Sequence, residues 1–350
     1  MAIFIIEGDL LKQTDVDAIV NTVNCVGVMG KGIALQFKKK WPANFKAYAA
    51  VCKAKALRPG NMHVYDAGAL ATPKYVINFP TKDHWRGKSR VEFIEDGLRE
   101  LVRVIGELQI KSIAIPPLGC GNGGLEWEPV KKMIEEAFSE LPEVEVRLFS
   151  PTWSPSAKDM QVTTLRPKMT PGRAAVLKLL ETYRALNYGV SKIEVQKLAY
   201  FLQEAGENLQ LKFEKYHYGP YADQLRHALD RMDGHFIVGV GDGVVDSEIE
   251  PKQDALDEAN AYIKNLDNQQ LVEHVARVEE LIDGFQSSYG MELLATVHWI
   301  ASQEHVDTPE AALSFIKKWN KRKRDLMKPE HVKIAWEHLS NQGWLTSVCA

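Results

Sequence analysis

Short apolar runs alternate with amphipathic segments through the first 150 residues of the chain. Continuous apolar runs predict buried strands, and apolar residues that recur every three to four positions predict helices. Because strands and helices alternate, we expect an α/β fold with a mainly parallel sheet between helices. The predicted strands are 3–6, 18–24, 75–79, 112–115 and 145–149, and the predicted helices are 33–40, 45–54, 90–107 and 130–139.

The pattern changes across residues 153–170, where prolines, serines and threonines indicate a linker. From residue 171 the periodicity is mainly helical, with one pair of strands expected at 213–218 and 235–240. We therefore expect two domains, residues 1–152 with the α/β fold and residues 171–350 mainly helical. The helices expected in the second domain are 174–187, 192–205, 222–232, 253–265, 271–285, 292–304 and 309–324.

The most informative stretch is a loop with four glycines in residues 119–124, between a predicted strand and a predicted helix. Glycine allows backbone N–H groups to approach phosphate oxygens closely, and a helix N-terminus adds unpaired N–H groups and a favourable dipole. The glycine spacing matches neither the dinucleotide-binding fingerprint nor the P-loop. The stretch is typical of a diphosphate-binding loop, and a glycine-rich turn without a ligand is the alternative.

A second glycine-rich loop, residues 27–34, also leads into a predicted helix. Ligands of parallel sheets bind beyond the carboxyl ends of the strands, where both loops are expected. Asp9 follows the first strand and has two interpretations, an acceptor for an adenine amino group or a cap of the next turn. Asn21 and Asn24 either hold ribose hydroxyls or stabilise a turn.

Lys82 follows the strand 75–79 at the same expected edge of the sheet. A lysine that is partly removed from water titrates lower and can act as a nucleophile or base, or it can stabilise a developing oxyanion. The alternative is a solvated loop lysine. Asp83 and His84 are weaker candidates for acid–base partners.

Composition narrows the class of protein. The net charge of −3 gives no strong indication of nucleic-acid binding, and no stretch has the roughly 20 apolar residues of a membrane helix. We expect no signal peptide, no metal and no cofactor, because the N-terminal apolar run is short and the histidines lack ligand spacing. The four cysteines, Cys25, Cys52, Cys120 and Cys349, form no CxxC pair, which predicts a reduced, cytoplasmic protein.

Charge is uneven in the second domain. Residues 242–283 hold twelve Asp and Glu against three Lys and Arg, whereas residues 317–324 are basic. The acidic span is either the solvated face of surface helices or a surface for a basic partner. The basic span is either a helix end that complements the dipole or a phosphate contact.

Five motifs together resemble one known family. They are residues 8–10, 20–24, 27–39, 78–82 and 116–127, which occur in the order found in macrodomains. Within that fold they are similar to the branch that includes the DarG antitoxins and the terminal ADP-ribose protein glycohydrolase. The length and character of residues 170–350 also resemble the DarG C-terminal domain, and residues 195–201 and 218–221 are more weakly similar to SocA-like antitoxins.

The resemblance implies an antitoxin that repairs DNA by hydrolysing ADP-ribose from thymidine bases, and that binds the DarT toxin through its C-terminal domain. It implies that Lys82 is catalytic, Asp9 binds adenine and Asn24 lies at the distal ribose. The ADP-ribose contacts that it implies are Gly8, Asp9, Leu10, Asn21, Thr22, Val23, Asn24, Gly30, Lys31, Gly32, Ile33, Ala34, Thr81, Pro117, Leu118, Gly119, Cys120, Gly121, Asn122, Gly123 and Phe149.

One position departs from part of this branch. Its protein-directed members carry an aspartate where this chain has Gly123, and the DNA-directed members share the Asn-Gly-Gly form. This form favours ADP-ribosylated single-stranded DNA as the substrate. The resemblance also implies the DarT toxin as a partner, and we expect no contact with a membrane. The alternatives are a reader that binds ADP-ribose without turnover, a protein-directed ADP-ribosyl hydrolase, and an interaction module with no ligand.

Overall fold

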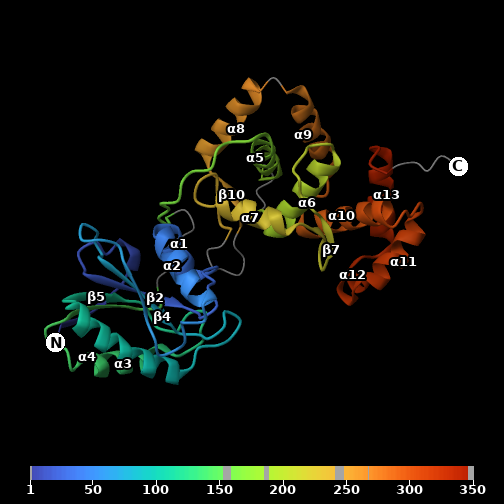
Figure 1. Cartoon of the computed structure of the whole chain (residues 1–350). Coiled ribbons are helices and arrows are strands. Elements are labelled where there is room, and N and C mark those ends of the chain that lie inside the picture. The colour runs from blue at the N-terminus through green and yellow to red at the C-terminus, as the bar shows by residue number, and fades with distance from the viewer. Residues whose placement is uncertain (1, 153–158, 185–188, 241–247, 267, 346–350) are drawn as a thin grey trace. The chain divides into compact units, whose positions relative to one another are not determined.

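The structure is a computed structural model that describes residues 2–152, 159–184, 189–240, 248–266 and 268–345. These residues form two compact units, one that extends to Leu165 and one that begins at Arg166 (Figure 1). Cys349 and part of the acidic span, residues 242–247 and 267, lie outside the described residues. Among the described residues, no helix has both the length and the apolar character needed to cross a membrane.

The first unit is built on a six-stranded sheet in the order β1-β6-β5-β2-β4-β3. All neighbouring pairs are parallel except β3 and β4, which run antiparallel. The predicted α/β fold is confirmed. The strands are β1 (Ala2–Ile6), β2 (Ala18–Val23), β3 (His63–Asp66), β4 (Tyr75–Pro80), β5 (Ser112–Ile115) and β6 (Glu145–Phe149).

Strand β3 has no counterpart among the predicted strands. It is four residues long, lies at the edge of the sheet and is only half-buried, so its apolar signal is weak. The antiparallel pairing of β3 with β4 makes the sheet mixed rather than wholly parallel.

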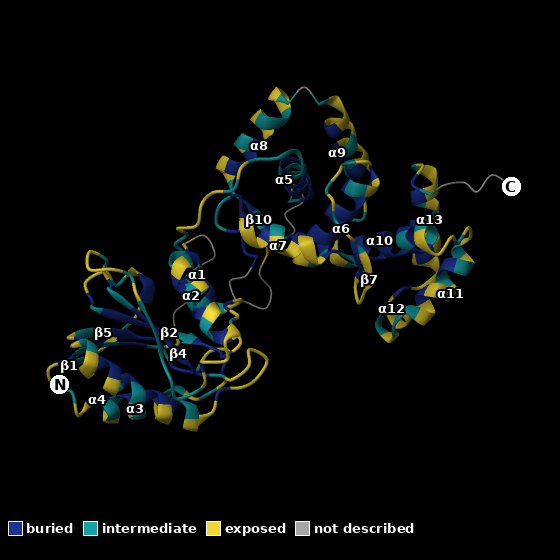
Figure 2. Cartoon of the chain, in the orientation of Figure 1, coloured by how far each residue is buried: buried dark blue, intermediate teal, exposed yellow. Residues whose placement is uncertain are grey.

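Helices cover both faces of this sheet because successive strand residues point to opposite faces. Val20 and Ile77 pack with α3 and α4, whereas Ile19 and Val76 pack with Phe37 of α1 on the other face. Figure 2 shows the sheet as mostly buried between these layers. The helices are α1 (Gly32–Lys40), α2 (Pro42–Lys53), α3 (Val91–Leu108) and α4 (Trp127–Phe138), with a short 3-10 helix at Leu10–Lys12.

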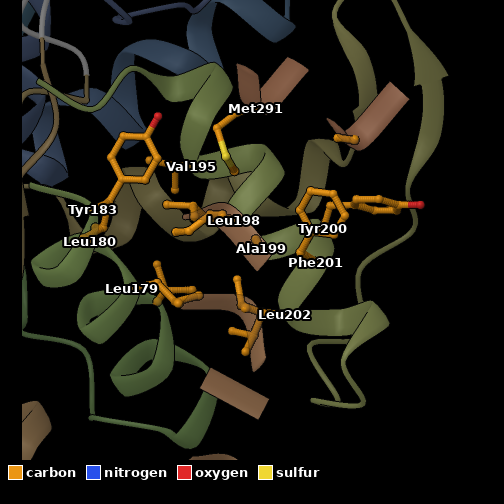
Figure 3. Packing of buried hydrophobic residues seen from close by; sticks show 14 of the residues in the cluster. Leu179, Leu180, Tyr183, Val195, Leu198, Ala199, Tyr200, Phe201, Leu202 and Met291 are labelled. Carbon is orange, nitrogen blue, oxygen red and sulfur yellow. The ribbon is translucent and has the colours of Figure 1, made fainter. Parts of the chain in front are cut away.

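The second unit is mainly helical, as predicted, and has its own core. Helix α6 lies in the centre of that core, with nine consecutive residues, 194–202, buried. Figure 3 shows Leu179 and Leu180 of α5 in one cluster with Leu198 and Leu202 of α6. The helices are α5 (Pro171–Arg184), α6 (Lys192–Glu204), α7 (Asp223–Met232), α8 (Gln253–Asn265), α9 (Gln269–Ile282), α10 (Ser288–Gln303), α11 (Pro309–Trp319), α12 (Lys321–Leu326) and α13 (Pro329–Asn341).

The predicted pairing of residues 213–218 with 235–240 is wrong. Strand β7 (Glu214–Tyr216) pairs instead with β8 (Gly219–Tyr221), and β9 (Ile237–Val238) pairs with β10 (Glu250–Pro251). Gly219 has a positive φ of 95°, which permits the tight turn between β7 and β8. Strands of two or three residues leave too little alternation for a sequence pattern to detect.

The predicted helix 309–324 is two helices. Asn320 is extended, with φ −162° and ψ 166°, and its side chain accepts a hydrogen bond from Lys323 N at 2.8 Å. The basic span is therefore divided by an N-cap instead of forming one helix end. Helix α13 (Pro329–Asn341), which follows, was not predicted.

Candidate active site

The site forms where β2 and β4 end side by side. Beyond the strands, Thr81 N donates to Val23 O at 3.0 Å, and Cys25 N donates to Asp83 O at 3.0 Å. These bonds continue the parallel pairing past the end of the sheet. They place Lys82, which lies between Thr81 and Asp83, beside the residues that follow β2.

Lys82 joins this edge to the glycine-rich loop of residues 119–124. The half-buried Lys82 side chain donates through Nζ to the carbonyl oxygen of Asn122. The Nδ2 atom of Asn122 lies 3.1 Å from the point where Gly32 would carry a Cβ. Both predicted loops and the predicted lysine therefore meet at Asn122. Partial burial lowers the pKa of Lys82, which makes its neutral amine more accessible than that of a solvated lysine.

Gly123 is buried where the loop turns back on itself. A Cβ at this position would lie 2.1 Å from Gly119 O and 2.3 Å from Ser89 Oγ. An aspartate therefore cannot replace Gly123 in this loop conformation. Ser89, which the sequence analysis did not select, donates its N–H to Gly123 O at 3.0 Å and supports the loop from outside.

Asp9 has the conformation of its capping interpretation. Its Oδ1 accepts a hydrogen bond from Leu11 N at 2.9 Å, at the start of the 3-10 helix Leu10–Lys12. Gly8 before it has a positive φ of 125° and open space around the Cβ position. Adenine binding by Asp9 stays a prediction, and the carboxylate keeps acceptor capacity for it beyond the bond to Leu11 N.

Asn24 stabilises the turn that follows β2. Its Oδ1 accepts from Val26 N at 3.0 Å and Val28 N at 3.3 Å, and its carbonyl oxygen accepts from Tyr48 Oη at 2.6 Å. The turn-stabilising interpretation is thus present in the structure. This turn holds the second glycine-rich loop in place beside Lys82.

The structure places Asn21 beneath the site. Asn21 is fully buried, and its Nδ2 donates to Asn78 Oδ1 at 2.9 Å. Asn78 in turn donates to Asn44 Oδ1 at 2.7 Å and lies 3.0 Å from His63 Nδ1. The sequence analysis missed this buried network, although a polar Asn78 inside an apolar strand was a usable signal. Burial lowers the pKa of His63, so the network is uncharged at neutral pH.

The remaining predicted contacts differ in exposure. Those that are exposed at the surface are Gly30, Lys31, Gly121 and Asn122, and those that are buried are Leu10, Val23, Thr81, Leu118, Gly119 and Phe149. The side chains of the buried group are enclosed by the protein, so any ligand contact from them has to come largely through backbone atoms. The others, Thr22, Gly32, Ile33, Ala34, Pro117 and Cys120, are half-buried.

Neither nearby cysteine is a suitable nucleophile. Burial raises the pKa of Cys25 to about 12 and that of Cys120 to about 11, so both thiols stay protonated at neutral pH. Of the weaker acid–base candidates, Asp83 and His84 are both exposed, and His84 Nδ1 accepts from Arg86 N at 3.2 Å. Among the described residues, no group of three or more His, Cys, Asp or Glu could hold a metal ion.

Several known proteins are similar to this chain. The family model described as "Macro domain" matches residues 20–134. The solved macrodomain of Mycobacterium tuberculosis DarG is 53% identical and covers 43% of this chain and 98% of that chain, with a TM-score of 0.42. A fusion protein of Thermosipho africanus, described as DNA ADP-ribosyl transferase-DNA ADP-ribosyl glycohydrolase, is 33% identical over 162 residues, 42% of this chain and 41% of that protein.

A relative from Thermus aquaticus extends the likeness to nearly the whole chain. It is described as a DNA ADP-ribosyl glycohydrolase and is 46% identical over 340 residues, which is 97% of this chain and 93% of the relative. The resemblance found in the sequence motifs is confirmed. The chain therefore belongs to the DNA ADP-ribosyl glycohydrolase family and carries a macrodomain in its N-terminal part.

Proposed function

We propose that the chain hydrolyses the bond between ADP-ribose and a thymidine base of single-stranded DNA, with Lys82 as its catalytic residue. The observation that carries the proposal is the contact of Lys82 Nζ with the Asn122 carbonyl, where the two glycine-rich loops meet. Family membership supports the same reaction, since relatives that span nearly the whole chain are described as DNA ADP-ribosyl glycohydrolases.

Lys82 acts at the anomeric carbon of the distal ribose in one of two ways. As a neutral amine it attacks this carbon: a carbon–nitrogen bond to lysine forms and the bond to the base breaks. The base takes up the proton that the lysine nitrogen loses, and water later releases the sugar and restores the amine. As an ammonium it donates a proton that assists ring opening and departure of the base while water attacks. Partial burial lowers the pKa of Lys82, which is the direction that the first route requires.

Gly123 supports DNA rather than protein as the substrate. The loop has no space for the aspartate that the protein-directed members of the branch carry at this position. In this loop conformation, a mechanism that combines Lys82 with an aspartate at position 123 is therefore excluded. We propose that Lys82 acts without a carboxylate from position 123.

Release of ADP-ribose from a thymidine-modified single-stranded oligonucleotide tests the proposal. We expect the wild type to release it and Lys82→Ala to lose at least about a hundredfold in rate, as expected for removal of a proton-transfer or nucleophilic group. Lys132→Ala, at an exposed position on α4, is the matched control and should keep the wild-type rate. Binding of ADP-ribose without release by the wild type would show a reader instead of a hydrolase.

We also propose that the second unit binds and inhibits a DarT transferase. The Thermosipho fusion protein, whose description joins a transferase to a glycohydrolase, supports a functional link between the two activities. A negatively charged surface on the second unit supports a partner with a cationic groove for single-stranded DNA, because carboxylates can occupy such a groove in place of phosphates.

Four carboxylates of the acidic span are available for this contact. Asp257 on α8, Glu273 and Glu280 on α9, and Asp283 after α9 are exposed, and none forms an ion pair with a described residue. Other carboxylates of the span are already engaged, since Asp254 and Glu258 bind Arg166 and Glu250 lies 3.5 Å from Arg184. We therefore assign the toxin contact to these four carboxylates, which form no ion pair with a described residue.

A further inference from the structure

A short loop that follows Lys82, residues 83–89, is anchored to the site at both ends. At its start, Asp83 O accepts from Cys25 N at 3.0 Å, and at its end Ser89 N donates to Gly123 O at 3.0 Å. Within it, Gly87 N donates to His84 O at 2.9 Å, which closes a turn. The loop therefore has a defined shape, and its tip is attached to the two segments that hold Lys82.

The tip of this loop presents an aromatic surface to solvent. Trp85 is 46% exposed, which is unusual for so large an apolar side chain. The His84 ring stacks on it with centroids 5.5 Å apart and 27° between the planes, and the Arg86 guanidinium lies 4.6 Å from its ring centroid. The indole is thus held in place by its neighbours without being covered by the core.

The same loop is positively charged. Arg86 and Lys88 lie within it and Arg90 directly follows it, and Asp83 is the one acidic residue between Lys82 and Arg90. None of these three cations forms an ion pair with a carboxylate of the described residues. An exposed aromatic ring among unpaired cations is the combination that binds single-stranded nucleic acid, because bases stack on the ring and phosphates pair with the cations.

We propose that residues 83–89 form a platform for the DNA strand that flanks the modified thymidine. A neighbouring base stacks on Trp85, and backbone phosphates contact Arg86 and Lys88. The inference rests on the proposed function, because it places the strand relative to a base that is attached to ADP-ribose at Lys82.

The chain geometry brings the platform within reach of that strand. Trp85 is the third residue after Lys82, so their Cα atoms are at most about 11 Å apart. Stacked nucleotides of one strand repeat about every 3.4 Å, so this span corresponds to the first few nucleotides beside the modified one. Trp85 can therefore meet a flanking base while Lys82 meets the distal ribose of the modified base.

Two substrates distinguish the contribution of the platform to activity from that of the catalytic site. One is a thymidine mononucleotide that carries ADP-ribose, and the other is a single-stranded oligonucleotide with the same modification and several nucleotides on each side. We measure the ratio of kcat/KM for the oligonucleotide to kcat/KM for the mononucleotide. Loss of one stacked base in Trp85→Ala should lower this ratio by about 5- to 100-fold.

Matched variants control for folding and for loss of a surface aromatic. Trp85→Phe should restore part of the ratio, because its ring still stacks. Phe4→Ala removes an aromatic residue of similar exposure, 50%, from the edge strand β1 and should leave the ratio unchanged. In the sheet order two strands lie between β1 and β2, and three lie between β1 and β4, so Phe4 lies apart from the platform.

Salt dependence tests the phosphate contacts. For the oligonucleotide, we measure the slope of log KM against log salt concentration. The double variant Arg86→Gln/Lys88→Gln should reduce this slope by about 1 to 2, because each removed cation takes away one phosphate contact. Lys131→Gln/Lys132→Gln on α4 removes the same charge elsewhere in the macrodomain and should leave the slope unchanged.

The outcomes distinguish this inference from the proposed function. If the wild type releases ADP-ribose from both substrates but Trp85→Ala leaves the ratio unchanged, the platform is overturned and the hydrolase stands. If the wild type releases ADP-ribose from neither substrate, the proposed function fails and the platform fails with it. A lower ratio in Trp85→Ala together with a reduced salt slope in the double variant supports the platform.

Discussion

At the scale of single residues, Gly123 shows most clearly how packing limits chemistry. Its missing side chain allows the loop to fold against Gly119 O and Ser89 Oγ. Gly121, two residues earlier, has open space at the Cβ position and no positive φ. Packing therefore excludes a side chain at position 123 but not at position 121. A pair of alanine variants tests this difference.

We expect Gly123→Ala to weaken ADP-ribose binding, because the added methyl group forces the loop out of position. Overpacking of this kind costs about 1 to 3 kcal/mol, which corresponds to a Kd about 5- to 150-fold higher if the displaced loop is the binding element. Gly121→Ala should bind with nearly wild-type affinity. Calorimetric titration of ADP-ribose into both variants measures the difference, and equal affinities would show that the loop does not hold the ligand.

At the scale of elements, a buried lysine connects helix α6 to the hairpin β7–β8. Lys197 is 1% exposed, and its Nζ donates to Pro220 O in β8 at 2.6 Å. Burial, and to a smaller extent the positive charge of Lys323, lower the pKa of Lys197 to about 7, while Glu292 opposes the shift. The hairpin is thus anchored by a group whose charge changes near neutral pH.

We expect the free energy of unfolding to rise with pH between about 7 and 10. In this range the unfolded chain keeps the proton on Lys197, with a pKa near 10.5, whereas the folded protein has released it, so raising the pH favours the folded state. The slope from one such group is at most about 1.4 kcal/mol per pH unit. Lys197→Met should reduce the slope in denaturant unfolding of the full chain, and an unchanged slope would exclude this assignment.

The same scale shows where sequence patterns fail. Most of the long helices and the central strands were predicted because their apolar periodicity extends over many residues. The hairpin β7–β8 and the pair β9–β10 were not, because strands of two or three residues contain almost no periodicity and their partners are set by packing. The break at Asn320 depends on one side chain that turns back to cap α12.

At the scale of the whole molecule, two units with separate cores carry two proposed functions. We expect the variant with Asp257, Glu273, Glu280 and Asp283 all changed to Lys to bind the DarT transferase at least about 100-fold more weakly, well beyond the roughly 1 kcal/mol of an ordinary surface ion pair. The same variant should still release ADP-ribose from DNA at the wild-type rate. Calorimetry and the release assay on the full chain measure the two effects.

The control for this prediction reverses as many carboxylates elsewhere in the second unit. It uses four exposed carboxylates on α11 to α13, which are Glu310, Asp325, Glu330 and Glu337. Changing these four to Lys alters the net charge by the same amount as the first variant. If both fourfold variants weaken binding alike, the effect is one of net charge, and the acidic span is not the toxin contact.

The sequence by itself determined the local features of this protein. These features are five of the six strands of the sheet, the two glycine-rich loops, the lysine after β4 and the change to helices near residue 170. They depend on residues that are close together along the chain. Periodicity and the conformational freedom of glycine are local properties, so they can be recognised without the fold.

Only the tertiary structure decided which of these features meet. Lys82 and Asn122 are 40 residues apart, and the bond between them exists because β4 and β5 bring their ends to one edge of the sheet on either side of β2. The burial of Asn21 against Asn78, 57 residues away, has the same origin. Contacts of this kind depend on how distant segments pack, and a local pattern does not contain that information.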